Sequence, residues 1–363
     1  MRWCPSVALT VLLFASPAGA QPPADPAIAA AWEALKQGDA ETADTRFTQA
    51  LQRNPKDPAL LFGAGAAAHL LGHEREAAER LRRALDLNPK LTEASAVLGE
   101  VEYLEGDLEA AIRTYETALK TATGEQPVLH ERLEKWRKET AVNTGLTDRR
   151  EARFSVVFDG QSESMLAEHA VAVLERAYSR ISERLGAYPS NRILVTLYSE
   201  QQFRDVTRMP AWANGAFDGK IRVPIHGWSR DVEQFDRVLV HELTHAMVFQ
   251  LAPHGVPIWL QEGLAGYFEA RDPEAAQRRV QSMKTVLPFS TLRESFNRLD
   301  ATSAAIAYEE SLVAADVLMR MLGPRMGVLL QSLGRGQSFE DSLGQLGTQA
   351  SEFEAQVLRR LQP

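Results

Sequence analysis

Hydrophobic residues recur at intervals of three and four over most of the chain, and this spacing predicts amphipathic helices. Further along, alternating or β-branched runs predict strands at 152–158 and 193–198 and a hairpin at 216–224. Helices at 162–185 and 200–207 separate them, and helices dominate the rest of the chain. This order predicts a helical region followed by an α+β domain, with a small mixed sheet and a helical C-terminal subdomain.

The first third of the chain repeats itself every 34 residues, with units at about 25–55, 56–89 and 90–126. Small and aromatic residues recur at matching positions: Gly38, Gly72 and Gly106; Ala43, Ala77 and Ala111; Phe47, Leu81 and Tyr115. These units resemble tetratricopeptide repeats, which are helix–turn–helix modules of this length. Residues 27–140 are therefore expected to form an all-α tetratricopeptide solenoid closed by a charged capping helix at 128–140.

The solenoid suggests two roles, which the sequence leaves open. Its concave face could hold a peptide or a protein partner, or the array could only space and stabilise its neighbour. His69, His73 and His130 are expected at the surface or in the groove, and not as metal ligands. Residues 141–150 are polar and contain a glycine, so a linker is expected before a second domain at 151–363.

Residues 1–20 have the pattern of a secretory signal peptide. Arg2 precedes an apolar run at 7–15, and Ala18 and Ala20 have the spacing of a cleavage site. The run is shorter than the ~20 residues that span a bilayer. We expect cleavage after Ala20 and a periplasmic or secreted product with no transmembrane segment.

Cleavage would leave a Pro-rich leader at 21–26 and remove Cys4, the only cysteine. The mature chain would then have no thiol to bind a metal. The full chain has 40 basic and 48 acidic residues, and loss of Arg2 takes the net charge from −8 to about −9. This balance, without a basic stripe, disfavours nucleic acid as a partner.

The segment 235–249 contains the motif His241-Glu242-Leu243-Thr244-His245 within a helical pattern that lacks glycine and proline. Residues i and i+4 lie about 40° apart around a helix, so both imidazoles lie on one face and could share a metal ion. Glu242 points about 100° from His241, which suits a general base rather than a ligand. Two core histidines bonded to the backbone are the alternative.

A catalytic zinc usually takes three protein ligands and leaves one position for water. A second helix is expected from about Pro257, in the sequence Pro-Ile-Trp-Leu-Gln-Glu-Gly-Leu-Ala-Gly-Tyr-Phe-Glu. Because 253–256 allow the chain to turn back, Glu262 can face the two histidines.

At this point the chain resembles the gluzincin metallopeptidases, specifically the peptidase-MA-like group, from about residue 154 to 361. The resemblance implies that His241, His245 and Glu262 bind one Zn²⁺ per chain and that Glu242 is the catalytic base. It also implies that Tyr308 stabilises the oxyanion, although a tyrosine filling the core fits the sequence equally well. Gly263 and Ala265 would let the two motif helices pack closely.

Many gluzincins carry an acidic residue one turn after the zinc-binding glutamate, where it orients a histidine, but Gly266 stands there in this chain. A backbone carbonyl or Asp236 could take that role. The strand 221–223 is expected at a sheet edge because Pro224 follows it, and the related fold suggests that an extended substrate could pair with it. His169, His226 and His254 are expected to have no role in the chemistry.

The expected activity is hydrolysis of peptide bonds by a metal-activated water in an exported zinc metallopeptidase. The repeats would recruit the substrate or a partner protein. Two alternatives stay open: an interaction scaffold with a degenerate peptidase domain, and a zinc amidase that acts on cell-wall material. Endopeptidase and exopeptidase activity are not distinguished.

Overall fold

The computed structural model describes residues 25–122, 124–160, 163–209, 214–225, 231–293 and 295–362. The signal peptide expected at 1–20 and His226 lie outside this part. The chain divides into two compact units between Thr144 and Gly145, and each is described by itself. No helix within the described ranges is long and apolar enough to cross a membrane.

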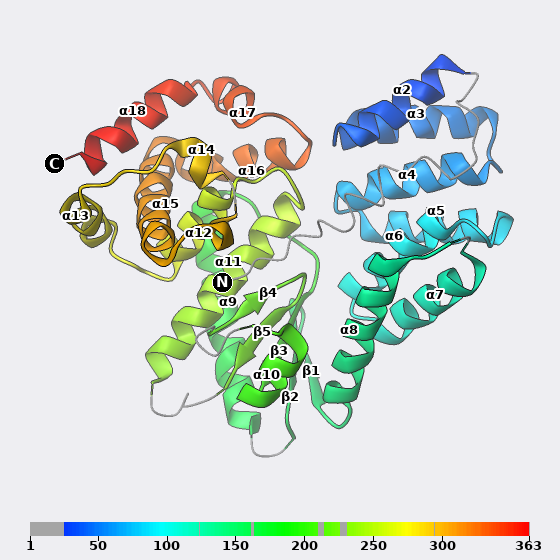
Figure 1. Cartoon of the computed structure of the whole chain (residues 1–363), viewed down its shortest axis with the longest axis horizontal. Helices are drawn as coiled ribbons and strands as arrows, with labels where there is room; N and C mark the ends of the chain where they lie inside the picture. The colour runs from blue at the N-terminus through cyan, green and yellow to red at the C-terminus, as the bar shows by residue number, and fades with distance from the viewer. Residues whose placement is uncertain are drawn as a thin grey trace. The chain divides into compact units, whose positions relative to one another are not determined.

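In its described part, residues 25–122 and 124–144, the first unit contains three helix pairs followed by a single helix (Figure 1). The elements are α2 (Pro26–Lys36), α3 (Ala40–Arg53), α4 (Pro58–Leu70), α5 (Glu74–Leu87), α6 (Thr92–Leu104), α7 (Leu108–Thr121) and α8 (Pro127–Asn143). Each pair turns at a glycine with positive φ, namely Gly38, Gly72 and Gly106, a conformation that glycine adopts without steric cost. The helix pairs thus coincide with the sequence units.

Aromatic residues fill the spaces within and between the helix pairs. The ring centroids of Trp32 and Phe47 lie 4.8 Å apart, and those of Trp32 and Phe62 lie 5.7 Å apart. Helix α8 closes the third pair with Trp136, whose ring stacks on Tyr103 at 5.0 Å. Although α8 is rich in charge, it therefore buries one apolar face against the pair before it.

The structure corrects the expectation for His69, which is not a surface or groove residue. Its side chain is buried, and its Nδ1 lies 2.7 Å from a carboxylate oxygen of Glu74. Burial alone would lower the pKa of His69, but the charge of Glu74, its hydrogen bond to His69 and the charge of Glu100 together outweigh burial and raise that pKa. His73 and His130 are exposed as expected.

The second unit contains a five-stranded mixed sheet with the order β1-β2-β3-β5-β4. The strands are β1 (Thr147–Arg150), β2 (Phe154–Phe158), β3 (Ile193–Tyr198), β4 (Ala216–Phe217) and β5 (Ile221–Pro224). Pairs β2–β3 and β3–β5 are parallel, and pairs β1–β2 and β4–β5 are antiparallel. The small mixed sheet predicted from the sequence is confirmed.

Two expectations about the strands are wrong. Strand β5 is not an edge, because Ile221 pairs with Val195 of β3 on one side and with Phe217 of β4 on the other. The edges are the short β4 and the charged β1. The supposed linker 141–150 instead contains the last turn of α8 and all of β1. Strand β1 has no buried residue, so its sequence lacks the alternation that identifies a strand.

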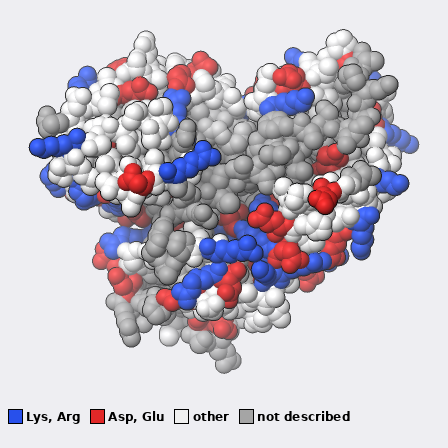
Figure 2. All heavy atoms as spheres, in the orientation of Figure 1, with Lys and Arg blue, Asp and Glu red and all other residues white. Residues whose placement is uncertain are grey.

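Charged side chains of both signs are interspersed on the described surface of the face drawn in Figure 2. Many of those beside β1 form ion pairs. Arg149 pairs with Glu151 and Glu168, each at 3.0 Å, and Arg150 pairs with Asp148 at 2.7 Å. Such charged side chains along an edge strand disfavour pairing with another chain, although each exposed ion pair contributes little stability.

The remaining elements are helical and surround one hydrophobic core with the sheet. They are α9 (Ser164–Leu185), α10 (Glu200–Thr207), α11 (Val232–Leu251), α12 (Ile258–Phe268), α13 (Pro273–Met283), α14 (Phe289–Leu292), α15 (Ala301–Leu322), α16 (Met326–Gly334), α17 (Phe339–Gln345) and α18 (Ala350–Leu361), with 3₁₀ turns at Phe296–Arg298 and Gly323–Arg325. The helices predicted at 162–185 and 200–207 are confirmed within two residues.

Helix α12 approaches α15 most closely at Gly263. A Cβ atom added to Gly263 would lie 2.2 Å from the carbonyl oxygen of Ser311 in α15. Gly263 was expected to serve the contact between the two motif helices, and that expectation is wrong. Gly263 instead lets α15 pack against the back of the helix that carries Glu262.

We expect Gly263→Ala to destabilise the protein by about 1–3 kcal/mol, because the new methyl group meets backbone that cannot rotate away. The midpoint and slope of urea unfolding would measure this change. Gly344→Ala is the matched control, since a Cβ at Gly344 meets nothing within 4 Å. It should be neutral or slightly stabilising, and equal effects of the two changes would contradict the close contact.

Candidate metal centre

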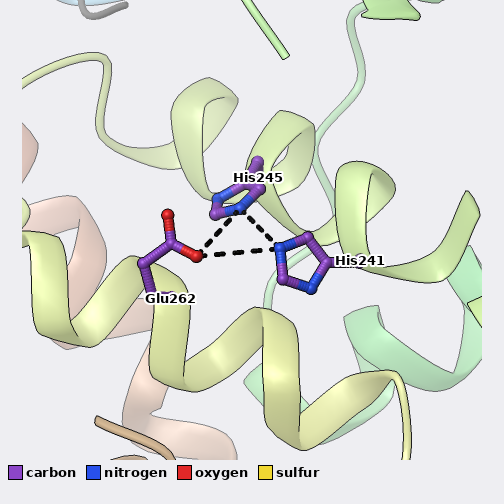
Figure 3. A group of neighbouring side chains, drawn as sticks. All are labelled: His241, His245 and Glu262. Atoms are coloured by element: carbon purple, nitrogen blue, oxygen red, sulfur yellow. Dashed lines mark hydrogen bonds and ion pairs between the residues drawn. The ribbon is translucent and has the colours of Figure 1, made fainter. Parts of the chain in front are cut away.

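The two histidines of the motif lie one turn apart on α11, and Glu262 reaches them from α12 (Figure 3). The Nε2 atoms of His241 and His245 are 3.2 Å apart, and Oε2 of Glu262 lies 3.7 Å and 3.8 Å from them. All three side chains are buried. The structure thus brings together the three residues that the sequence motifs pick out.

These three atoms have the separation and chemistry of metal ligands. Ligand atoms about 2.1 Å from a tetrahedral metal ion lie about 3.4 Å apart, close to the spacings here. Oε2 of Glu262 is buried and has no hydrogen-bond partner among the described residues, which is costly for a carboxylate unless a cation faces it. Across the described ranges, this is the single group of three such side chains that could hold a metal ion.

A second carboxylate orients one of the imidazoles. Oε2 of Glu269 lies 3.0 Å from Nδ1 of His241. With the proton on Nδ1, His241 donates to Glu269 and leaves the Nε2 lone pair for a metal. No such partner is found for Nδ1 of His245 among the described residues.

Glu269 was not among the groups expected to orient a histidine, which were a backbone carbonyl and Asp236, and the expectation for Asp236 is wrong. Oδ1 of Asp236 lies 2.6 Å from Nε2 of His169 on α9, so this ion pair joins α9 to α11. A signal for Glu269 was available in the sequence. Residue i+7 of a helix lies about 20° from residue i, so Glu269 follows Glu262 by two turns on the same face.

Glu242 is almost fully buried, and burial raises its pKa to about 7. The backbone of Gly215, just before β4, covers one of its oxygens: a Cβ atom on Gly215 would lie 2.6 Å from Oε1 of Glu242. That oxygen has no hydrogen-bond partner in the described part of the chain. Glu242 is therefore a carboxylate that can exchange a proton near neutral pH.

The charges of the centre favour a cation. Burial alone would lower the pKa of His241, but contacts with Glu262 and Glu269 outweigh it and raise that pKa. Burial lowers the pKa of His245, which stays neutral. Burial would raise the pKa of Glu262, yet the two histidines lower it. A proton on His241 thus supplies positive charge at the place where a bound metal ion would supply it.

Tyr308 lies on α15. It is partly buried against Phe296, with ring centroids 5.2 Å apart. Burial raises its pKa, and the charges of Glu262 and Glu242 raise it further. The hydroxyl therefore stays protonated and able to donate near the two carboxylates.

The mixed sheet is thus accompanied by two histidines on one helix and a glutamate on the next, a group that could hold a metal ion. A family model described as the Peptidase MA superfamily matches residues 173–354, half of the chain and all of the centre. The chain belongs to this superfamily. No curated protein matches the chain.

Addition of Zn²⁺ should raise the unfolding temperature of the protein, by an amount that grows with metal concentration, because the folded state alone presents the three ligands together. At a zinc concentration of 100 times the dissociation constant, the folded state gains about 2.7 kcal/mol of stability. Thermal denaturation with and without metal would measure it.

In the same titration, Glu262→Gln should lose most of the rise in unfolding temperature that zinc causes in the wild type. Glu233→Gln, which changes an exposed residue of α11, should keep it. A metal response that survives in Glu262→Gln would place the ion elsewhere.

Proposed function

We propose that the second unit is a zinc-dependent peptidase. The proposal is supported above all by the buried group of His241, His245 and Glu262, whose free nitrogen and oxygen atoms face one point. A set of two imidazoles and one carboxylate is typical of a catalytic zinc that keeps one position open. Membership in the superfamily supports peptide bonds as the target.

His241, His245 and Glu262 would hold the ion. When bound, zinc supplies Lewis acidity, which lowers the pKa of a water molecule to ~7 and polarises a carbonyl group. Glu242 takes the proton of the attacking water and delivers it to the leaving amine. Its pKa of about 7 suits both transfers near neutral pH.

Tyr308 is proposed as the donor to the oxyanion. Its hydroxyl stays protonated beside the two carboxylates, and a donor that is already oriented stabilises charge as it develops. Because α15 carries Tyr308 and also packs on Gly263, the donor is held at a fixed place relative to Glu262.

The first unit is proposed to be a tetratricopeptide array that recruits a protein substrate or partner. The 34-residue period and the three helix pairs support this assignment. Export is proposed from the signal-like segment at 1–20.

Glu242→Gln should abolish hydrolysis while zinc content stays near one ion per chain, since the amide is not basic and Glu242 is not a ligand. General base catalysis contributes about 10²–10⁴ in rate, so the loss should be at least 100-fold. Metal analysis and cleavage of an unfolded protein substrate would test this pair of results.

If Glu242→Gln were as active as the wild type, the mechanism would be refuted. Loss of zinc from the variant would show that Glu242 also acts as a ligand. Comparison of new amino termini in cells that express either form would then identify natural substrates.

Gly215→Ala should lower the turnover number about 10-fold or more with zinc content unchanged. The added methyl group would come within 2.6 Å of Oε1 of Glu242, and the flexible carboxylate must move, which displaces the base. The unfolding temperature should fall as well, because the methyl group would also lie 2.9 Å from Cγ of Glu242 and from Cγ1 of Val238, which are buried. Unchanged turnover would show that the base tolerates the shift.

A further inference from the structure

Four charged residues continue outward from His241 in a chain of alternating sign. The contacts run from His241 to Glu269, Arg271, Glu309 and Arg279. The two carboxylate oxygens of Glu269 contact different neighbours. Oε2 lies 3.0 Å from Nδ1 of His241, and Oε1 lies 3.8 Å from Nε of Arg271. The guanidinium of Arg271 thus lies within ion-pair distance of the carboxylate that contacts Nδ1 of His241.

Glu309 fixes Arg271 in turn. Its two oxygens accept from Arg271 and Arg279, each at 2.8 Å. The side chain of Glu309 is only 13% exposed, so water screens these pairs less than at an open surface. Glu309 directly follows Tyr308 on α15, and a constraint on one therefore limits the position of the other.

The backbone also fixes Arg271. Ala270 adopts a left-handed conformation, with φ 66°, where α12 ends, a state that is costly for a residue with a Cβ. The turn brings the backbone N–H of Arg271 to within 3.1 Å of the carbonyl oxygen of Gly266. A Cβ on Gly266 would lie 3.6 Å from Cδ of Arg271, so the arginine lies over the face of α12 that this glycine leaves bare.

We infer that Arg271 and Glu309 are positioning residues of the metal centre, which hold Glu269 against His241 and couple that ligand to the helix of Tyr308. This inference rests on the proposed function. It explains how His241 is oriented although Gly266 stands where many gluzincins carry an acidic residue. The orienting carboxylate belongs to Glu269, two turns after Glu262, and Arg271 occupies the space above the glycine.

The test is the zinc dissociation constant, measured by competition with a chelator in the full chain. Glu269→Gln should weaken zinc binding by about 10- to 100-fold, as loss of a carboxylate behind a metal-bound histidine does. Arg271→Gln and Glu309→Gln act one and two contacts further away, so each should weaken binding by about 2- to 30-fold. The double variant should be no weaker than the worse single one, because both act through one chain of contacts.

Two controls separate positioning from a general loss of structure. Arg278→Gln removes an exposed arginine of the same helix as Arg279, one that pairs only loosely with Asp272 at 3.6 Å, and should bind zinc as the wild type does. Arg271→Lys keeps the charge and should recover part of the affinity that Arg271→Gln loses. The unfolding temperatures of the metal-free proteins should agree within a few degrees.

If the wild type binds zinc and both Arg271→Gln and Glu309→Gln bind it equally well, the inference is refuted while the proposed function stands. The inference is also refuted if Arg278→Gln weakens binding as much as Arg271→Gln does, because the effect would then be one of net charge. A wild type that binds no zinc would refute the metal centre and this inference with it.

Discussion

The second unit depends on one constraint: several ionisable side chains are buried together and need compensating positive charge. Glu242, Glu262 and Glu269 surround the two imidazoles between α11 and α12. Removing carboxylates from water costs several kcal/mol each unless positive charge faces them. In the metal-free protein a proton on His241 meets part of this demand, and a divalent cation at the same point would meet more of it.

Helix α15 fixes the positions of several groups around these buried charges. It packs on α12 at Gly263, carries Tyr308, whose pKa the charges of Glu262 and Glu242 raise, and carries Glu309 into the ion pairs that reach His241. One helix therefore meets the ligand helix through its backbone and takes part in the ion pairs behind His241. The sheet plays a smaller direct part, chiefly through the backbone at Gly215, which covers the base.

Much of this fold could be predicted from the sequence, for a local reason. The helix pairs of the first unit follow from a 34-residue repeat, and the strands at 193–198 and 216–224 follow from alternation and a turn signal. The elements that were missed have no such pattern. Strand β1 is charged and forms only by pairing with β2, and β5 became an inner strand because β4 pairs beyond it.

The sequence by itself determined that two imidazoles share one face of a helix, because the spacing of residues i and i+4 fixes their directions wherever that helix lies. It also identified Glu262, since a helix that follows a short turn must pack back on its predecessor. The helical spacing also places Glu269 on the same face as Glu262, but only the tertiary structure shows that Glu269 reaches His241. Only the tertiary structure shows that Gly215 covers Glu242 and that Asp236 pairs with His169 of α9. Those contacts join separate elements, and local spacing does not fix the distances between elements.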